Sequence, residues 1–168
     1  MPTVNLRSFR QIVRNNKKGI RNFLARLEKK APRGLDKLKT EADKEAWSRT
    51  DCLDCANCCK TMSPTYTQKD IKRISAHLGM TAKAFREKWL YKDNTGDWMN
   101  VKQPCQFLDL TTNMCNIYEV RPRDCAGFPH HHKKMVGYMH MYKQNIEYCP
   151  ATYRVVEIIR EKAEKGEL

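Results

Sequence analysis

The 168-residue sequence contains no stretch of about eighteen apolar residues, the minimum for a helix that spans a bilayer. It also lacks a secretory signal, because Arg7, Arg10 and Arg14 interrupt the N-terminal segment where an apolar run would have to lie. An Arg-rich N-terminus can also be a mitochondrial transit peptide, but this one continues smoothly into the rest of the chain. We therefore expect a cytoplasmic protein without a transmembrane segment. In such a reducing compartment, cysteines bind metal more often than they form disulfides.

The sequence also lacks the patterns of the common enzyme classes. It shows no Ser-His-Asp set, no phosphate-binding loop and no paired carboxylates. A cysteine nucleophile of low pKa is disfavoured, because thiolates that already bind metal are poor free nucleophiles. The sequence leaves the catalytic residues unknown and favours a protein that is not an enzyme. If it is one, an iron–sulfur oxidoreductase is the expected type.

Apolar residues are few for a packed globule, whereas cysteines are abundant. The chain is 40% hydrophobic and 30% charged, and it contains eight cysteines. A thin core of this kind needs another source of stability, and bound metal can supply it. We predict an α+β fold that is mostly α: a small metal-stapled domain with a short β-hairpin and an N-terminal basic amphipathic helix. The expected division is a basic helical arm over residues 1–50 and a cysteine-cluster domain over residues 51–168.

Apolar periodicity and capping residues place the expected elements. An amphipathic helix is predicted over 6–30, followed by a polar helix or linker over 35–50. Thr67 and Thr81 are predicted N-caps of two short helices, the first with Asp70 three positions on. Short strands are expected at 98–101 and 106–108, with a turn at 111–113 that leads into 116–118. Pro122 and Pro150 mark the starts of two later helices.

Positive charge is concentrated ahead of the first cysteine. The formal net charge is +13, and residues 1–50 carry +9 of it, with fourteen Lys or Arg against five Asp or Glu. Such a basic block fits a polyanion, an anionic surface or an acidic protein partner. It is equally compatible with a solvated helix face whose apolar stripe packs against the rest of the protein. The basic N-terminal helix is therefore the predicted site for a polyanion or protein partner.

The cysteines are spaced like metal ligands. The first four stand as C-x2-C-x2-C-C, and the complete set is Cys52, Cys55, Cys58, Cys59, Cys105, Cys115, Cys125 and Cys149. A C-x2-C step lets two thiolates reach one ion while backbone amides donate to the sulfurs. Two such steps followed by an adjacent cysteine make chance a poor explanation. We predict that all eight cysteines are metal ligands, the alternative being buried thiols that act as small hydrophobes.

The spacing leaves the metal and the number of sites open. In extended backbone the side chains of Cys58 and Cys59 diverge, so they can reach two nearby sites or a polynuclear cluster more easily than one ion. A distorted turn would still let both bind one ion. Three of the cysteines match the start of a ferredoxin-type run, but zinc is equally well held by four thiolates. The predicted cofactor is zinc or an iron–sulfur cluster.

Three blocks in order resemble the YkgJ-type cysteine-cluster family. They are the C-x2-C-x2-C-C motif at 52–59, the Pro-Cys-Gln-Phe-Leu segment at 104–108, and the segment from Cys115 through Arg121-Pro122 to Cys125 and Phe128-Pro129. The family is described as chelating zinc or iron, and the resemblance covers roughly residues 50–150. It implies that the matching cysteines are the chelating residues and that Cys149 is a weaker match. It implies a metal centre and no particular reaction.

Other residues near the motifs are possible contributors to the centre. The run His130-His131-His132 could supply a ligand, although a solvated loop is the favoured reading. Lys60, Arg121 and Arg123 could offset the negative charge of a thiolate site. Tyr118 and Phe128 are expected to pack over the centre and shield it from water.

Overall fold

The computed structural model describes residues 4–167, and its Cα atoms group into two compact units. The first unit is Met1–Cys55 with Pro129–Leu168, and the second is Ala56–Phe128. The described residues are mostly helical and include one two-stranded antiparallel sheet, which confirms the predicted α+β, mostly α class. None of the described helices is long and apolar enough to cross a membrane. The predicted division at residue 50 stays a prediction, and residues 1–3 and 168 of its ranges lie outside the description.

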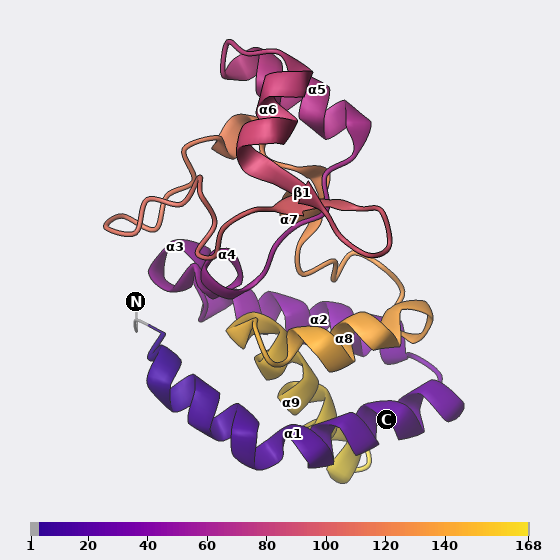
Figure 1. The fold of residues 1–168 in the computed structure, drawn as a ribbon. Helices are drawn as coiled ribbons and strands as arrows, with labels where there is room; N and C mark the ends of the chain where they lie inside the picture. Colours follow the sequence, from indigo (N-terminus) through magenta and orange to yellow (C-terminus); the bar gives the residue numbers. More distant parts are fainter. Residues whose placement is uncertain (1–3, 168) are drawn as a thin grey trace. The chain divides into compact units, whose positions relative to one another are not determined.

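The first unit is a bundle of helices (Figure 1). Its described elements are α1 (Leu6–Lys29), α2 (Leu35–Ser48), α3 (Cys52–Cys55), the 3-10 helix η2 (Val136–Tyr138), α8 (Met139–Asn145) and α9 (Pro150–Glu164). Helix α2 packs on α9, and α1 packs on both α8 and α9. Most of the predicted apolar stripe of α1 is buried, namely Phe9, Val13, Ile20, Phe23, Leu24 and Leu27, whereas Ile12, also predicted to belong to it, is 46% exposed. The apolar side of α1 therefore packs against other helices of the same unit.

Ion pairs fix the packing of α1 along its polar edge. Lys17 Nζ and Arg21 Nη2 lie 2.7 Å and 2.9 Å from the two carboxylate oxygens of Glu147. Lys143 Nζ, on α8, pairs with Glu28 near the other end of α1. Exposed pairs of this kind stabilise weakly, by roughly 0–1 kcal/mol each. The burial of the apolar stripe is thus the main reason for the position of α1.

The second unit carries short helices around one hairpin. Its elements are α4 (Asn57–Thr61), α5 (Gln68–His77), α6 (Ala82–Trp89), β1 (Leu90–Lys92), β2 (Trp98–Asn100), the 3-10 helix η1 (Tyr118–Val120) and α7 (Arg123–Gly127). The predicted N-caps are confirmed: Thr67 forms a capping box with Asp70, and the Thr81 side chain accepts from the Ala84 amide. The apolar core consists of Tyr66, Ile71, Ile74, Phe85, Leu90, Phe107 and Ile117, against which Cys105 and Cys115 pack.

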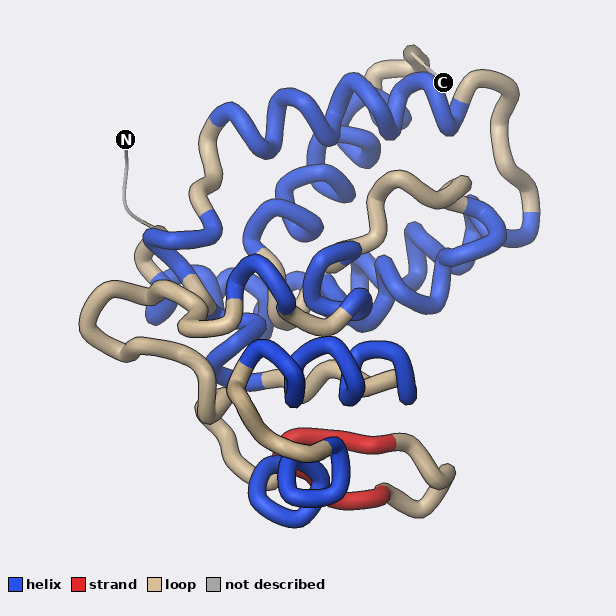
Figure 2. Tube along the Cα trace, turned by 90° about the horizontal axis from the view of Figure 1, so that it is seen from above, coloured by secondary structure: helices blue, strands red, loops and turns tan. Residues whose placement is uncertain are grey.

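The hairpin pairs different segments from those expected. Strand β1 pairs with β2 in the register Leu90↔Asn100, with a turn between them (Figure 2). The predicted strand at 106–108 is wrong, since only the isolated bridge Leu108↔Cys115 forms there. Leu90 extends the apolar stripe of α6 in sequence, but its backbone is already extended at that point. The strand therefore begins directly where α6 ends, at Leu90.

Asp70 joins α5 to the segment that carries Cys125. Its carboxylate accepts from the Thr67 hydroxyl at 2.6 Å, from Arg73 Nη2 at 2.9 Å and from the Arg123 amide at 3.2 Å. Burial alone would raise the pKa of Asp70, but these hydrogen bonds outweigh it and the pKa is lowered. The start of α7 is thus fixed to the start of α5 by a buried, ionised side chain.

Candidate metal centre

Backbone hydrogen bonds bring three cysteine-bearing segments of the second unit together, and a bond to the Asp124 side chain ties the fourth to Thr65. The Cys105 amide donates to the Cys59 carbonyl at 2.8 Å, which joins α4 to the loop that follows β2. The bridge Leu108↔Cys115, with the Asn116 amide donating to Phe107 at 2.8 Å, folds Cys115 back beside that loop. Cys125 lies on α7, beside Asp124, which accepts from the Thr65 amide at 3.0 Å.

The adjacent cysteines lie on one short helix, not in extended backbone. Ala56, the N-cap of α4, has a positive φ of 42°, so the motif changes direction there and Cys58 and Cys59 enter a new helical turn. Their sulfurs are 4.0 Å apart. The divergence expected for neighbouring side chains in an extended segment therefore does not apply, and the two thiols face the same neighbourhood.

The thiols of Cys59, Cys105, Cys115 and Cys125 affect one another's pKa. A hydrogen bond from Cys58 lowers the pKa of Cys59, burial opposes it, Lys60 lowers it further, and the result is a pKa of about 7. Burial raises the pKa of Cys105, Cys115 and Cys125, and negative charge on Cys59 raises each of them further. These four sulfurs are thus close enough to influence one another's ionisation.

Asn100 presents an unsatisfied donor beside this group. The side chain is 3% exposed, and its Oδ1 accepts both from the Tyr66 hydroxyl at 2.6 Å and from Gln106 Nε2 at 2.9 Å. Those two bonds determine the orientation of the amide. Its Nδ2 is buried and makes no hydrogen bond of good geometry with the described residues, and a longer hydrogen bond from the Asn100 side chain to Cys105 lowers the pKa of that thiol. A thiolate at Cys105 would be the natural acceptor for this donor.

Tyr66, like Asn100, was not predicted from the sequence to lie near the site. Burial raises the pKa of its phenol, and negative charge at Cys105, Cys125 and Cys115 adds to the rise. Its hydroxyl therefore stays protonated and donates to Asn100. No local pattern in the sequence marks either residue, since each acts through partners brought together by the hairpin.

The remaining predicted ligands belong to the first unit. Cys52 is exposed, whereas Cys55 is buried at the end of α3. Cys149 is buried as the N-cap of α9, and burial raises its pKa while a hydrogen bond with Thr152 lowers it. All eight cysteines lie within residues 4–167, and none of them forms a disulfide there. Within residues 4–167, no three His, Cys, Asp or Glu side chains converge as ligands of one ion, so the second unit gathers the thiols without closing them around a point.

The histidine run is not simply a solvated loop. His131 is 5% exposed; its Nδ1 lies 2.5 Å from Asp43 and its Nε2 lies 2.9 Å from the Thr152 hydroxyl. Burial lowers the pKa of His131, against the opposing effect of Asp43. Its ring stacks on Tyr142 with centroids 5.3 Å apart. His131 is thus a buried polar link between α2 and α9.

Tyr118 does not shield the sulfurs as expected. Its side chain is 48% exposed, and the Arg121 guanidinium lies 3.7 Å from its ring centroid. Arg121 still lowers the pKa of Cys115, so it contributes positive charge to the site as predicted for a thiolate centre. Apolar cover on the sulfurs comes instead from the core around Phe107 and Ile117.

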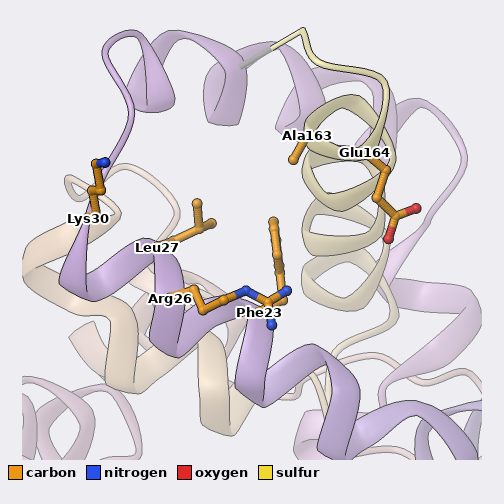
Figure 3. Close-up of a pocket in the computed structure, with 6 residues that line it drawn as sticks. All are labelled: Phe23, Arg26, Leu27, Lys30, Ala163 and Glu164. Atoms are coloured by element: carbon orange, nitrogen blue, oxygen red, sulfur yellow. The ribbon is translucent and has the colours of Figure 1, made fainter.

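A pocket in the first unit lies apart from this chemistry. It has a volume of about 380 Å³ and opens between the ends of α1 and α9 (Figure 3). Its lining residues are Phe23, Arg26, Leu27, Lys30, Ala163 and Glu164. The lining includes no cysteine or histidine, so the pocket is not a metal site.

Comparison with known proteins agrees with the cysteine pattern. Residues 51–150 match the family model CxxCxxCC, whose description is "Putative zinc- or iron-chelating domain". An uncharacterized protein of Methanocaldococcus jannaschii, MJ0661, is 32% identical over 81 residues, which are 47% of this chain and 43% of that protein. The match thus spans less than half of that relative's length. No solved structure matches. Since the family model covers more than half of the sequence, the chain belongs to the CxxCxxCC family.

Proposed function

We propose that the second unit chelates zinc or iron through thiols drawn from Cys58, Cys59, Cys105, Cys115 and Cys125. The observation that carries this proposal is that Cys59, Cys105, Cys115 and Cys125 lie close enough to affect one another's pKa, with the buried Nδ2 of Asn100 beside Cys105. Leaving a buried donor without a partner costs about 1–3 kcal/mol. A metal-bound thiolate would accept from it, because bound sulfur remains strongly negative.

The donor set suits such an ion. Two sulfurs of a tetrahedral zinc site, each about 2.3 Å from the ion, are about 3.8 Å apart. The sulfurs of Cys58 and Cys59 are separated by 4.0 Å, so one ion could hold both. Burial of the thiols against an apolar core limits the access of water, and Lys60 and Arg121 offset part of the negative charge.

The bound group would serve mainly to hold the unit together. Structural zinc supplies folding free energy directly, whereas an iron–sulfur cluster at the same thiolates would add electron transfer. We infer a non-enzymatic role in either case, with oxidoreduction as the alternative for a cluster. Eight cysteines without a disulfide among the described residues fit a reducing compartment, for which we propose the cytoplasm.

A pair of single substitutions tests the ligand set. Protein purified anaerobically should retain less zinc or iron in Cys125→Ser than in wild type. Cys149→Ser is the matched variant from the first unit. If it loses as much metal as Cys125→Ser, Cys149 is also a ligand. If its metal content is unchanged, Cys149 is only the buried N-cap of α9. Wild-type metal content in Cys125→Ser would contradict the proposal.

The exposed side of α1 favours a second, separate function. That helix carries many cations on a face that the fold leaves uncovered, which is compatible with a polyanionic partner. This surface contains no cysteine and would act independently of the metal.

A further inference from the structure

The exposed face of α1 is a continuous basic stripe. Arg7, Arg10, Arg14 and Lys18 are all exposed and follow one another at three- and four-residue steps. Residues at such steps lie on one side of a helix. With a rise of about 1.5 Å per residue, the stripe from Arg7 to Lys18 is about 16 Å long. It is therefore a linear array of cations and not a scattered charge.

Charge on this stripe is left largely uncompensated. No carboxylate of residues 4–167 lies within ion-pair distance of Arg7, Arg14 or Lys18, whereas Lys17 and Arg21 on the flank are paired with Glu147. The only acidic residue of α1 is Glu28, near its C-terminal end. An anionic partner could thus be bound without breaking an internal ion pair of those three residues.

The apolar face of α1, opposite the basic stripe, is not available for insertion into lipid. A helix that binds a membrane surface buries its apolar face among acyl chains. Here that face is already occupied, with Phe9, Val13 and Ile20 at most 7% exposed against the rest of the first unit. Exposing it would require unfolding of the bundle. Ile12 of α1 is 46% exposed, and the polar face of the helix is the larger surface available to a partner.

Amide side chains accompany the cations. Gln11, Asn15 and Asn22 are exposed on α1, and Gln11 Nε2 donates to Asn15 Oδ1 at 3.1 Å beside Arg14. Arginine recognises guanine, and asparagine or glutamine recognises adenine, through paired hydrogen bonds in the major groove. Amides add little to binding at a lipid headgroup layer, so their presence favours nucleic acid.

We propose that the exposed face of α1 docks in the major groove of duplex DNA. A helix about 10–12 Å across fits a groove about 12 Å wide, and α1 presents its polar side while its apolar side packs on α8 and α9. The arginines and Lys18 contact phosphates, and the amides reach base edges. A-form RNA offers no equivalent, because its major groove is too narrow for side chains. This inference does not depend on the proposed metal site.

The test compares charge removed from the stripe with charge removed elsewhere in the same unit. The full chain, the triple variant Arg7→Gln/Arg14→Gln/Lys18→Gln and the control Lys37→Gln/Lys44→Gln/Lys165→Gln are titrated with a fluorescent 20-base-pair DNA duplex. All six positions are exposed, and the two variants lose the same charge. Circular dichroism and thermal melting verify that each variant folds. Parallel arms use double-stranded RNA of the same length and vesicles of mixed phosphatidylglycerol and phosphatidylcholine.

The proposal predicts a specific loss of salt dependence. Loss of three phosphate contacts should make the negative slope of log K against log salt shallower by about 3. Binding at 0.15 M salt should weaken on the order of 100-fold. The control should bind like wild type. Gln11→Ala/Asn15→Ala should weaken binding while leaving the salt slope unchanged. Equal weakening by the two charge variants, wild-type binding by the amide variant, or tighter binding to RNA or vesicles than to duplex DNA would overturn the proposal.

Discussion

Replacing Asn100 by aspartate tests the hydrogen bond that the proposed metal centre would complete. The substitution keeps the size of the side chain and the Oδ1 that accepts from Tyr66 and Gln106. It replaces the buried Nδ2 donor, which lies beside Cys105, by an oxygen that cannot donate to a thiolate. The change therefore removes one donor and adds a buried carboxyl without changing the size of the side chain.

The expected effect on metal affinity follows from that donor. A hydrogen bond to a charged group contributes about 1.5–3 kcal/mol, which corresponds to about 10–100-fold in the dissociation constant of the metal. Residues that support metal ligands by hydrogen bonding show effects of this size. The repulsion between a buried carboxylate and nearby thiolates acts in the same direction, so about tenfold is the smallest loss we expect.

Competition with a chromophoric chelator measures the affinity under anaerobic, reducing conditions. Asn94→Asp provides the matched control, because it makes the same chemical change in the exposed turn between β1 and β2. The control should bind zinc or iron like wild type. An Asn100→Asp protein that is folded and binds metal with wild-type affinity would refute the role assigned to this amide.

Asp70→Asn should destabilise the second unit by about 3 kcal/mol, since a capping box and a partly buried ion pair are lost together. Because the folded-state pKa of Asp70 is lowered, its contribution is present above pH ~4, the unfolded pKa, and is lost as pH falls further. Thermal melts of both proteins between pH 7 and pH 2 should converge at the acid end, and a constant difference would contradict this reasoning. Removing metal with a chelator should lower the protection of backbone amides from hydrogen exchange in Ala56–Phe128. Protection in α1 and α9 should stay the same, because their core is apolar. Equal protection of Ala56–Phe128 with and without metal would mean that the thiols serve only in packing.

Local patterns were sufficient for the elements that depend on local contacts. The capping box of Thr67 and Asp70 lies within one helical turn, so its residues alone predicted the start of α5. The apolar stripe of α1 likewise predicted its length to within a residue or two. For 35–50 the pattern left helix and linker open, and the structure forms α2 there because it packs on α9, far along the chain.

The features that the sequence missed depend on long-range partners. Strand β1 begins at Leu90 because it pairs with Asn100, and no local signal distinguishes Leu90 from another residue of the preceding helix. His131 is buried because Asp43, 88 residues earlier, lies beside it. The role of Asn100 depends in the same way on Tyr66 and Cys105, which only the folded unit brings together.

X-ray absorption spectroscopy of the metal in the full chain, purified anaerobically, tests the central claim most directly. We predict zinc or iron bound to the protein with sulfur scatterers at about 2.3 Å, and fewer of them in Cys125→Ser. A protein that holds no metal, or one whose metal is surrounded only by nitrogen and oxygen, would contradict the account of the second unit as a thiolate chelating centre.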